Sequence, residues 1–183
     1  MSAEQGPVFQ AVPERNTADV ILRTAQQHHV QLSAMADVKA NIIITVSSIV
    51  LTLSFGNMDD KDLRMSAITL TVFTMAALLL AILAVLPKYR PLRLKADAPL
   101  PPQFNLLFFG HFAELSRERF VAEVAKKMTT QGSTIYETMA RDLYSLGYYL
   151  AHFKYRYLRW SYLFFLAGFV IATLLQLWRL VVG

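Results

Sequence analysis

The stretch Met65–Leu86, MSAITLTVFTMAALLLAILAVL, decides the fold of this chain because it is a long apolar run without a single charged residue. A helix of this length measures about 33 Å and can cross the roughly 30 Å hydrocarbon core of a bilayer. The whole chain has the same character, since 55% of its 183 residues are hydrophobic and only 17% are charged. That balance is unusual for a soluble domain. The sequence therefore predicts a membrane protein with one span at residues 65–86.

Two further apolar runs predict two more spans, at residues 40–56 and 160–179. Serine, threonine and asparagine dilute the first run, whereas the second is rich in aromatic residues. Trp160 and Trp178 stand near its two ends, as expected for rings at the two membrane interfaces. No signal peptide is expected, because the first apolar run starts only after about 40 residues and no short basic region precedes it.

The charges of the connecting segments set the predicted orientation. The loop between the first two spans has three aspartates against Lys61 and Arg64. The segment between the second and third spans is rich in lysine and arginine. By the positive-inside rule that segment faces the cytoplasm, with the N-terminus inside and the C-terminus outside.

Residues outside the spans are predicted to form a cytosolic helical bundle. Residues 1–15 contain glycine and prolines without periodicity and predict a flexible tail. Residues 16–39 predict a cytosolic helix that runs into the first span, since no proline or glycine interrupts them. A stripe of residues at spacings of three and four predicts the buried face of this helix: Ile21, Ala25, His28, Leu32 and Met35.

Residues 87–103 contain five of the seven prolines of the chain and predict an extended basic linker that leaves the membrane. Its lysines and arginines suit anionic lipid headgroups. Nucleic-acid binding is the alternative, but the segment lacks a fold that could place a helix or strand in a nucleic-acid groove. No nucleic-acid partner is therefore predicted.

Residues 104–159 are the predicted cytosolic sensor helices. Gly110 breaks a short apolar segment, and Ser116 can cap a helix that ends near Met128. A last helix is expected from about Thr134 through the third span. The predicted fold is thus an all-α membrane protein whose three transmembrane helices are joined to a cytosolic bundle. Extensions of the first and third spans and the intervening loop helix build this bundle.

Two faces can be distinguished on the cytosolic half of that last helix. One is a heptad-like seam for packing a second helix: Leu143, Leu146, Leu150, Phe153, Tyr157 and Trp160. The other combines aromatic and basic residues: Arg141, Tyr144, Tyr148, His152, Tyr155 and Arg159. This second face is either an amphipathic flank near the membrane or a cleft for a small anionic ligand, with arginine for a phosphate and flat rings for a base.

A polar line runs down the first span, made of Asp37, Asn41, Thr45, Ser48 and Thr52. Such side chains rarely face lipid. They either form hydrogen bonds with a neighbouring helix or line a water-filled pore between copies of the chain. Gly168 and Ala172 in the third span form a small-xxx-small pair that favours close helix packing. Because three spans bury little of the polar line, a homo-oligomer is predicted.

Asp37 and Lys39 stand where the first helix enters the membrane. As a charge pair, they would link the cytosolic helices to the placement of the first span. Alternatively, Lys39 simply extends its ammonium group to the headgroups.

Catalysis and metal binding are not expected. The chain has no cysteine, and it shows no nucleophile–base pair, no metal-ligand spacing and no phosphate-binding glycine loop. Glu137, Asp142 and His152 could be assembled into a site, but polar residues on a long helix are usually solvated. His28 and His29 have no partner at ligand spacing. The predicted role is therefore not that of an enzyme, and no metal or cofactor is predicted.

Three blocks in this order resemble the membrane effectors of Pycsar, the pyrimidine cyclase antiphage systems. The first is LSAMADVKANIIITVSSIVLTL (residues 32–53), with the family's D-KAN pattern. The second is FFGHFAELSRERF (108–120). The third is RDLYSLGYYLAHFKYRYLRWSYLFFLAGFVI (141–171). One departure is Phe120, where the family tends to have tyrosine.

The resemblance implies an antiphage defence effector in the bacterial inner membrane. A cognate cyclase would make cyclic CMP or cyclic UMP on infection, and the effector would respond by impairing the membrane, which causes abortive infection. The positions that match the family suggest ligand-binding residues: Arg141, Tyr144, Lys154, Asp37, Lys39 and Asn41. The alternative is a non-sensing membrane anchor for a partner such as a phosphohydrolase.

Overall fold

The computed structural model describes residues 16–87, 99–102, 104–129 and 134–182, and these residues form helices and loops without any strand. The predicted tail at residues 1–15 and most of the predicted linker at 87–103 lie outside the described residues. The chain divides into two compact units. One contains the described residues of 1–30 and 88–148, and the other contains those of 31–87 and 149–183.

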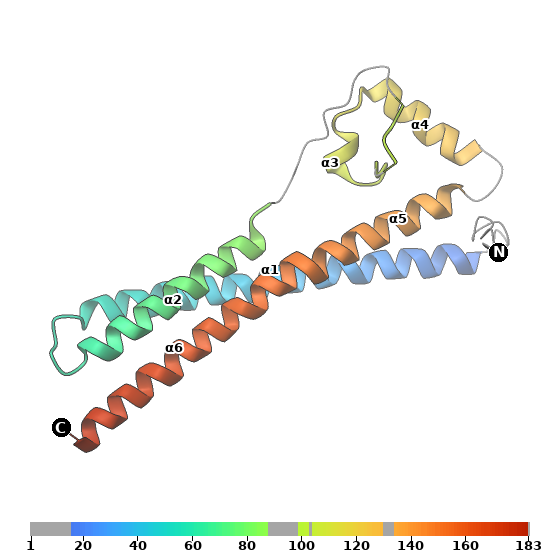
Figure 1. Cartoon of the computed structure of the whole chain (residues 1–183). Coiled ribbons are helices and arrows are strands. Elements are labelled where there is room, and N and C mark those ends of the chain that lie inside the picture. Colours follow the sequence, from blue (N-terminus) through green and yellow to red (C-terminus); the bar gives the residue numbers. More distant parts are fainter. Residues whose placement is uncertain (1–15, 88–98, 103, 130–133, 183) are drawn as a thin grey trace, which may run out of the picture. The chain divides into compact units, whose positions relative to one another are not determined.

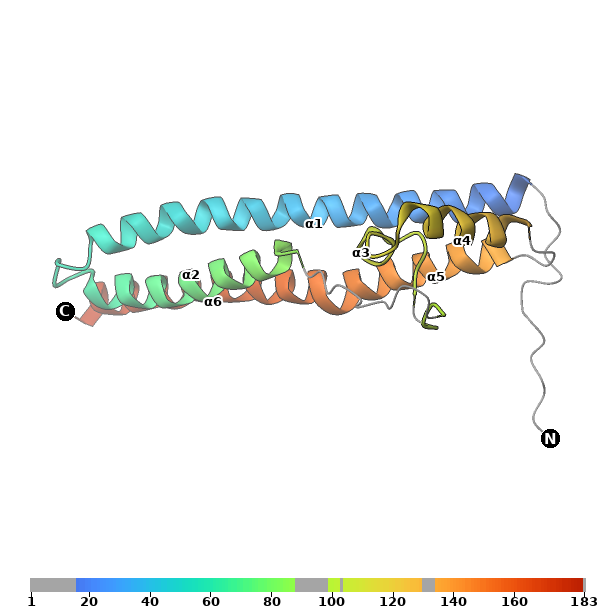
Figure 2. The ribbon, with the colours of Figure 1, turned by 90° about the horizontal axis from the view of Figure 1, so that it is seen from above.

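Among the described residues, three helices are long and apolar enough to cross a membrane, which supports a multi-pass membrane protein. They are α1 (Asn16–Gly56), α2 (Arg64–Val85) and the helix that ends in α6 (Tyr155–Val182). Figures 1 and 2 show the membrane segments of α1, α2 and α6 running alongside one another. As predicted, α1 starts at Asn16 and continues without a break into the first span.

Small side chains allow close packing in the unit of residues 31–87 and 149–183, which contains the spans and is called the membrane unit below. Ala36, Ala40, Ala84 and Leu158 form a buried cluster that joins α1, α2 and α6. A Cβ atom added at Gly168 would lie only 2.6 Å from the Cβ atom of Phe73, so α6 and α2 approach so closely that only glycine fits there. Such contacts stabilise membrane helices through van der Waals packing, because lipid offers no hydrophobic driving force between them.

The inward face of α1 differs from the predicted one. The predicted stripe is wrong, since Ile21, His28, Leu32 and Met35 are exposed and Ala25 is only half-buried. The buried positions of α1 recur at spacings of three and four on a neighbouring face: Ala36, Ala40, Ile43, Ser47, Leu51 and Ser54. Hydrophobicity misled the prediction because in a membrane protein apolar side chains can face lipid while small residues face the neighbouring helix.

A π-helical turn, η1 (Leu150–Lys154), joins α5 (Thr134–Tyr149) to α6 without a break, so the predicted continuous helix is found. A π turn holds an extra residue and rotates the residues that follow it around the helix axis. The predicted seam therefore fails in part after Leu150, since Phe153 and Trp160 are exposed, whereas Tyr157 is half-buried and packs against the buried cluster. The buried positions are instead Leu150, Lys154, Leu158 and Ser161.

The described part of the segment between α2 and α5 contains two short helices, α3 (Phe109–Phe112) and α4 (Arg117–Thr129) (Figure 1). Ser116 caps α4 as predicted, because its Oγ atom accepts a hydrogen bond of 3.2 Å from the backbone N–H of Arg119. The apolar segment before it forms only a single helical turn and surrounding loops.

Candidate functional site

Asp142 on α5 connects three elements of the other unit, that of residues 1–30 and 88–148: α5, the start of α1 and the loop before α3. One carboxylate oxygen accepts a hydrogen bond from Nε2 of Gln26 on α1, at 3.0 Å. The other accepts a hydrogen bond from Nδ2 of Asn105, at 2.8 Å. The carboxylate therefore fixes the loop before α3 against α5 and α1, a positioning role for a residue of the third family-like block.

Asn105 is itself a buried hub of the loop before α3. Its backbone N–H donates to Nδ1 of His111 at 2.9 Å, and its Oδ1 atom accepts from the backbone N–H of Leu107 at 3.0 Å. Burial lowers the pKa of His111 below its ordinary value of 6.5. A neutral imidazole at pH 7 is what the hydrogen bond needs, because Nδ1 then carries a free lone pair.

The ordered loop frames two hollows of about 450 Å³ and 590 Å³ in the same unit. A volume of this order suits a small-molecule ligand. The two hollows share part of their lining and are therefore neighbours. The shared residues are Pro102, Phe104, Asn105, Glu137 and Arg141.

Basic side chains line the smaller hollow: Arg141 on α5 and Lys126 and Lys127 from the last turn of α4. Glu123 and Glu137 are the acidic members of its lining. Arg141 donates to the carboxylate of Glu137 at 2.6 Å and to the backbone carbonyl of Pro102 at 3.1 Å. The guanidinium group is thus oriented toward the loop before α3, and its fork suits a phosphate oxygen pair.

Aromatic faces border the larger hollow. Tyr144 lines it and is 72% exposed, and its ring stacks on that of Tyr148 with centroids 6.0 Å apart. Phe104 lines both hollows and lies 5.6 Å from the His111 ring. An exposed ring beside a guanidinium group offers a planar base a stacking surface next to a phosphate contact.

Lys154, another residue that the resemblance suggested for ligand binding, lies in the membrane unit. Its side chain is only 8% exposed. Its Nζ atom donates to Oδ2 of Asp37 at 2.7 Å and to Oγ of Ser33 at 2.8 Å, and it lies 2.7 Å from Oδ1 of Asp37 in an ion pair. The ammonium group is therefore bound to partners within the chain. Asp37 pairs with Lys154 from η1, and the predicted Asp37–Lys39 pair is not formed.

The other residues of the predicted polar line lie on the outer surface of α1 in the single chain. Asn41, Thr45, Ser48 and Thr52 are all exposed. The Ser48 and Thr52 hydroxyls donate to backbone carbonyls one turn earlier, at 2.8 Å and 3.0 Å. Lys39 is exposed, and its backbone carbonyl accepts from the Tyr162 hydroxyl at 3.4 Å. In the third span, Gly168 and Ala172 are both buried.

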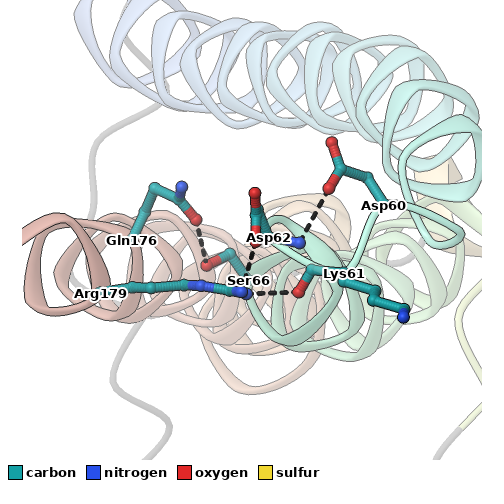
Figure 3. A network of polar contacts seen from close by, with 6 residues as sticks. All are labelled: Asp60, Lys61, Asp62, Ser66, Gln176 and Arg179. Atoms are coloured by element: carbon teal, nitrogen blue, oxygen red, sulfur yellow. Dashed lines mark hydrogen bonds and ion pairs between the residues drawn. The ribbon is translucent and has the colours of Figure 1, made fainter. Parts of the chain in front are cut away.

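A second polar network lies at the opposite end of the spans, where the α1–α2 loop meets the last turns of α6 (Figure 3). Arg179 is paired with the carboxylate of Asp62 at 2.5 Å and donates to the carbonyl of Lys61. Ser66 donates to the side-chain carbonyl of Gln176 at 3.1 Å. The network ties α6 to the hairpin that joins the first two spans.

Of the residues predicted from the sequence to bind a ligand, Arg141 and Tyr144 line these neighbouring hollows. Sequence reasoning missed Asn105 and the lysine pair at 126–127, because these residues approach the site only through the fold of the loop and α4. The one available signal was the position of the two lysines in the last turn of a short amphipathic helix. Lys154 and Asp37 form a separate pair in the other unit.

Among the described residues no group of histidine, aspartate and glutamate side chains could hold a metal ion. No curated protein and no solved structure matches the chain. A family model, the Pycsar effector protein domain PycTM, matches residues 20–180 and so spans both units. The chain therefore belongs to the Pycsar effector protein domain family.

Proposed function

We propose that this chain is an antiphage effector that binds cyclic CMP or cyclic UMP at the hollows beside Arg141 and then impairs the inner membrane. The observation that carries the proposal is that Arg141, Lys126 and Lys127 line one cavity of about 450 Å³ in a member of the Pycsar effector family. A cyclic mononucleotide carries one phosphate charge and one planar base, and the site offers a partner for each.

Arg141 is the proposed phosphate contact, with the two lysines of α4 adding positive charge. The cyclic phosphate would compete with Glu137 for the guanidinium group, so binding would release the 2.6 Å ion pair between them. Phe104 and Tyr144 would stack on the pyrimidine. Lys154, Asp37, Lys39 and Asn41 are not part of this proposed contact set.

The proposed orientation follows the charges of the connecting segments. The segment from the second span to the third carries most of the basic residues outside the N-terminal helix, so it would face the cytoplasm, where a cyclase product is available. The loop between α1 and α2, with Asp59, Asp60 and Asp62, would face outward.

A homo-oligomer is part of the proposal. The exposed polar line of α1, from Asn41 to Thr52, would be covered by a second copy of the chain, because polar side chains are disfavoured against lipid. α1 and the α5–η1–α6 helix each have residues in both units, so a rearrangement around the nucleotide can be transmitted to the spans along continuous helices. The nucleotide acts by binding one arrangement more tightly than the other.

The test is binding by the purified full chain in detergent, measured by calorimetry and by thermal shift over a set of cyclic mononucleotides. Arg141→Gln should weaken binding by at least about tenfold, since a charge-assisted contact is worth roughly 1.5–3 kcal/mol. Arg117→Gln is the matched control, because Arg117 is exposed on α4 and does not line either hollow.

Failure of every cyclic mononucleotide to bind the wild-type chain would overturn the proposal and favour the membrane-anchor role. Equal loss of binding in the two variants would show that general charge, and not the Arg141 contact, governs the interaction.

A further inference from the structure

Four hydroxyl groups inside the membrane unit have no hydrogen-bond partner among the described residues: those of Ser47, Ser54, Thr71 and Thr74. Ser47 and Thr74 are fully buried, and Ser54 is 5% exposed. A buried hydroxyl without a partner is destabilising. Their presence in the packed interior of a three-helix unit therefore needs a reason.

The helical geometry of α1 does not prevent its serine and threonine hydroxyls from forming hydrogen bonds. Ser48 and Thr52, which point outward on the same helix, each donate to the carbonyl one turn earlier. This local bond is open to serine and threonine in any helix. The outward hydroxyls thus make the bond, whereas the inward ones do not.

The inward hydroxyls lie at successive depths. Ser47 is nine residues before the end of α1 and Thr74 is ten residues after the start of α2. At 1.5 Å per residue, both lie about 14 Å from the hairpin end of the spans. By the same measure Thr71 lies at about 10 Å and Ser54 at about 3 Å. The hydroxyls therefore form a series of polar groups at increasing depth, here called the ladder, in the half of the three-helix unit nearest the α1–α2 loop.

Polar groups continue this ladder toward the other end. The fully buried Ser161 on α6 donates to the carbonyl of Ala77 at 2.7 Å, a depth of about 20 Å. Asp37, paired with Lys154, lies at about 28 Å. The pair and the ladder together span nearly the full hydrocarbon thickness of about 30 Å. The Asp62–Arg179 network of Figure 3 stands at the outer end.

We infer that the buried hydroxyls of α1 and α2 line a latent path for water and protons inside each chain, which hydrates when the effector is activated. The inference rests on the proposed function, and it deepens it by placing the membrane lesion within one three-helix unit. Hydration would give each unpartnered hydroxyl a hydrogen-bond partner, so separation of α1 from α2 costs less along this face than along an apolar one.

The chain has no cysteine, so single-cysteine variants report water access at chosen positions. Ser47→Cys and Thr74→Cys probe the inward-facing hydroxyls of the ladder. Ser48→Cys is the matched control on the outward-facing side of α1. The variants are reconstituted in phosphatidylethanolamine–phosphatidylglycerol vesicles with a pH-sensitive dye inside. Proton leakage and the reaction with a charged methanethiosulfonate reagent are then followed before and after adding cyclic CMP or cyclic UMP.

The expected result is that the nucleotide raises the reaction rate at positions 47 and 74 by at least about tenfold, because only a hydrated thiol ionises and reacts. The control at position 48 should not change. Ser47→Ala combined with Thr74→Val should also slow the induced proton leak by roughly tenfold, the effect of about 1.4 kcal/mol on the barrier.

Leaking vesicles in which the inner positions stay unreactive, or in which only position 48 reacts, would overturn the inference and locate the path elsewhere. Vesicles that bind nucleotide without leaking would overturn the proposed membrane effect, and the inference with it. The leak itself distinguishes these two failures.

Discussion

The ion pair between Lys154 and Asp37 makes an asymmetric prediction about stability. Lys154 is 8% exposed at its side chain and Asp37 is 43% exposed. Asp37→Ala leaves a buried ammonium group with only the Ser33 hydroxyl as partner. Breaking a buried pair in this way costs about 3–5 kcal/mol, and we expect about 2–3 kcal/mol because one side of this pair meets solvent.

Lys154→Met should cost less, below about 1 kcal/mol, because the unbranched apolar side chain of methionine fills most of the same space and the remaining carboxylate can be hydrated. In the double variant the two changes should not add, and its stability should return close to that of Lys154→Met alone. Equilibrium unfolding in mixed detergent micelles, followed by circular dichroism, measures the free energy of unfolding of the wild type, the two single variants and the double variant. A loss in Lys154→Met equal to or larger than that in Asp37→Ala would contradict the expected asymmetry between the two partners.

Two further predictions concern packing and pH. Gly168→Val should destabilise the chain by about 1–3 kcal/mol through collision with Phe73, whereas Gly56→Ala, with no atom within 4 Å of the new Cβ, should stay within about 0.5 kcal/mol in the same unfolding assay. Burial lowers the pKa of His111, so its neutral ring contributes stability that is complete above pH 6.5 and is lost as the pH falls below this value. Thermal unfolding at several pH values should show this loss in the wild type and a flatter profile in His111→Gln; parallel profiles would mean that the bond from Asn105 does not depend on the charge of the ring.

Much of the helical organisation could be predicted from composition alone. An uncharged run such as Met65–Leu86 has few alternatives to a membrane helix, and the long helices follow from the absence of proline between Asn16 and Gly56 and from Thr134 onward. Ser116 was predictable as a cap because the signal is local.

Faces and partners were harder to predict than helices. Apolar periodicity marks a core in water, but in lipid the packed face of α1 carries alanine and serine, so the predicted stripe failed. A π turn at residues 150–154 leaves no sequence signal that a spacing rule detects, so the predicted seam shifted. Likewise, the Asp37–Lys154 pair joins residues far apart in sequence, and helical spacing could not have revealed it.

We propose that one chain both senses a cyclic nucleotide and damages a bilayer. The most direct measurement is dye release from vesicles that contain only this purified protein, with cyclic CMP or cyclic UMP supplied on the side of the basic segments. Release that follows nucleotide occupancy and disappears in Arg141→Gln but not in Arg117→Gln is the predicted result. Full occupancy with intact vesicles would contradict the claim and would mean that a second protein carries out the damage.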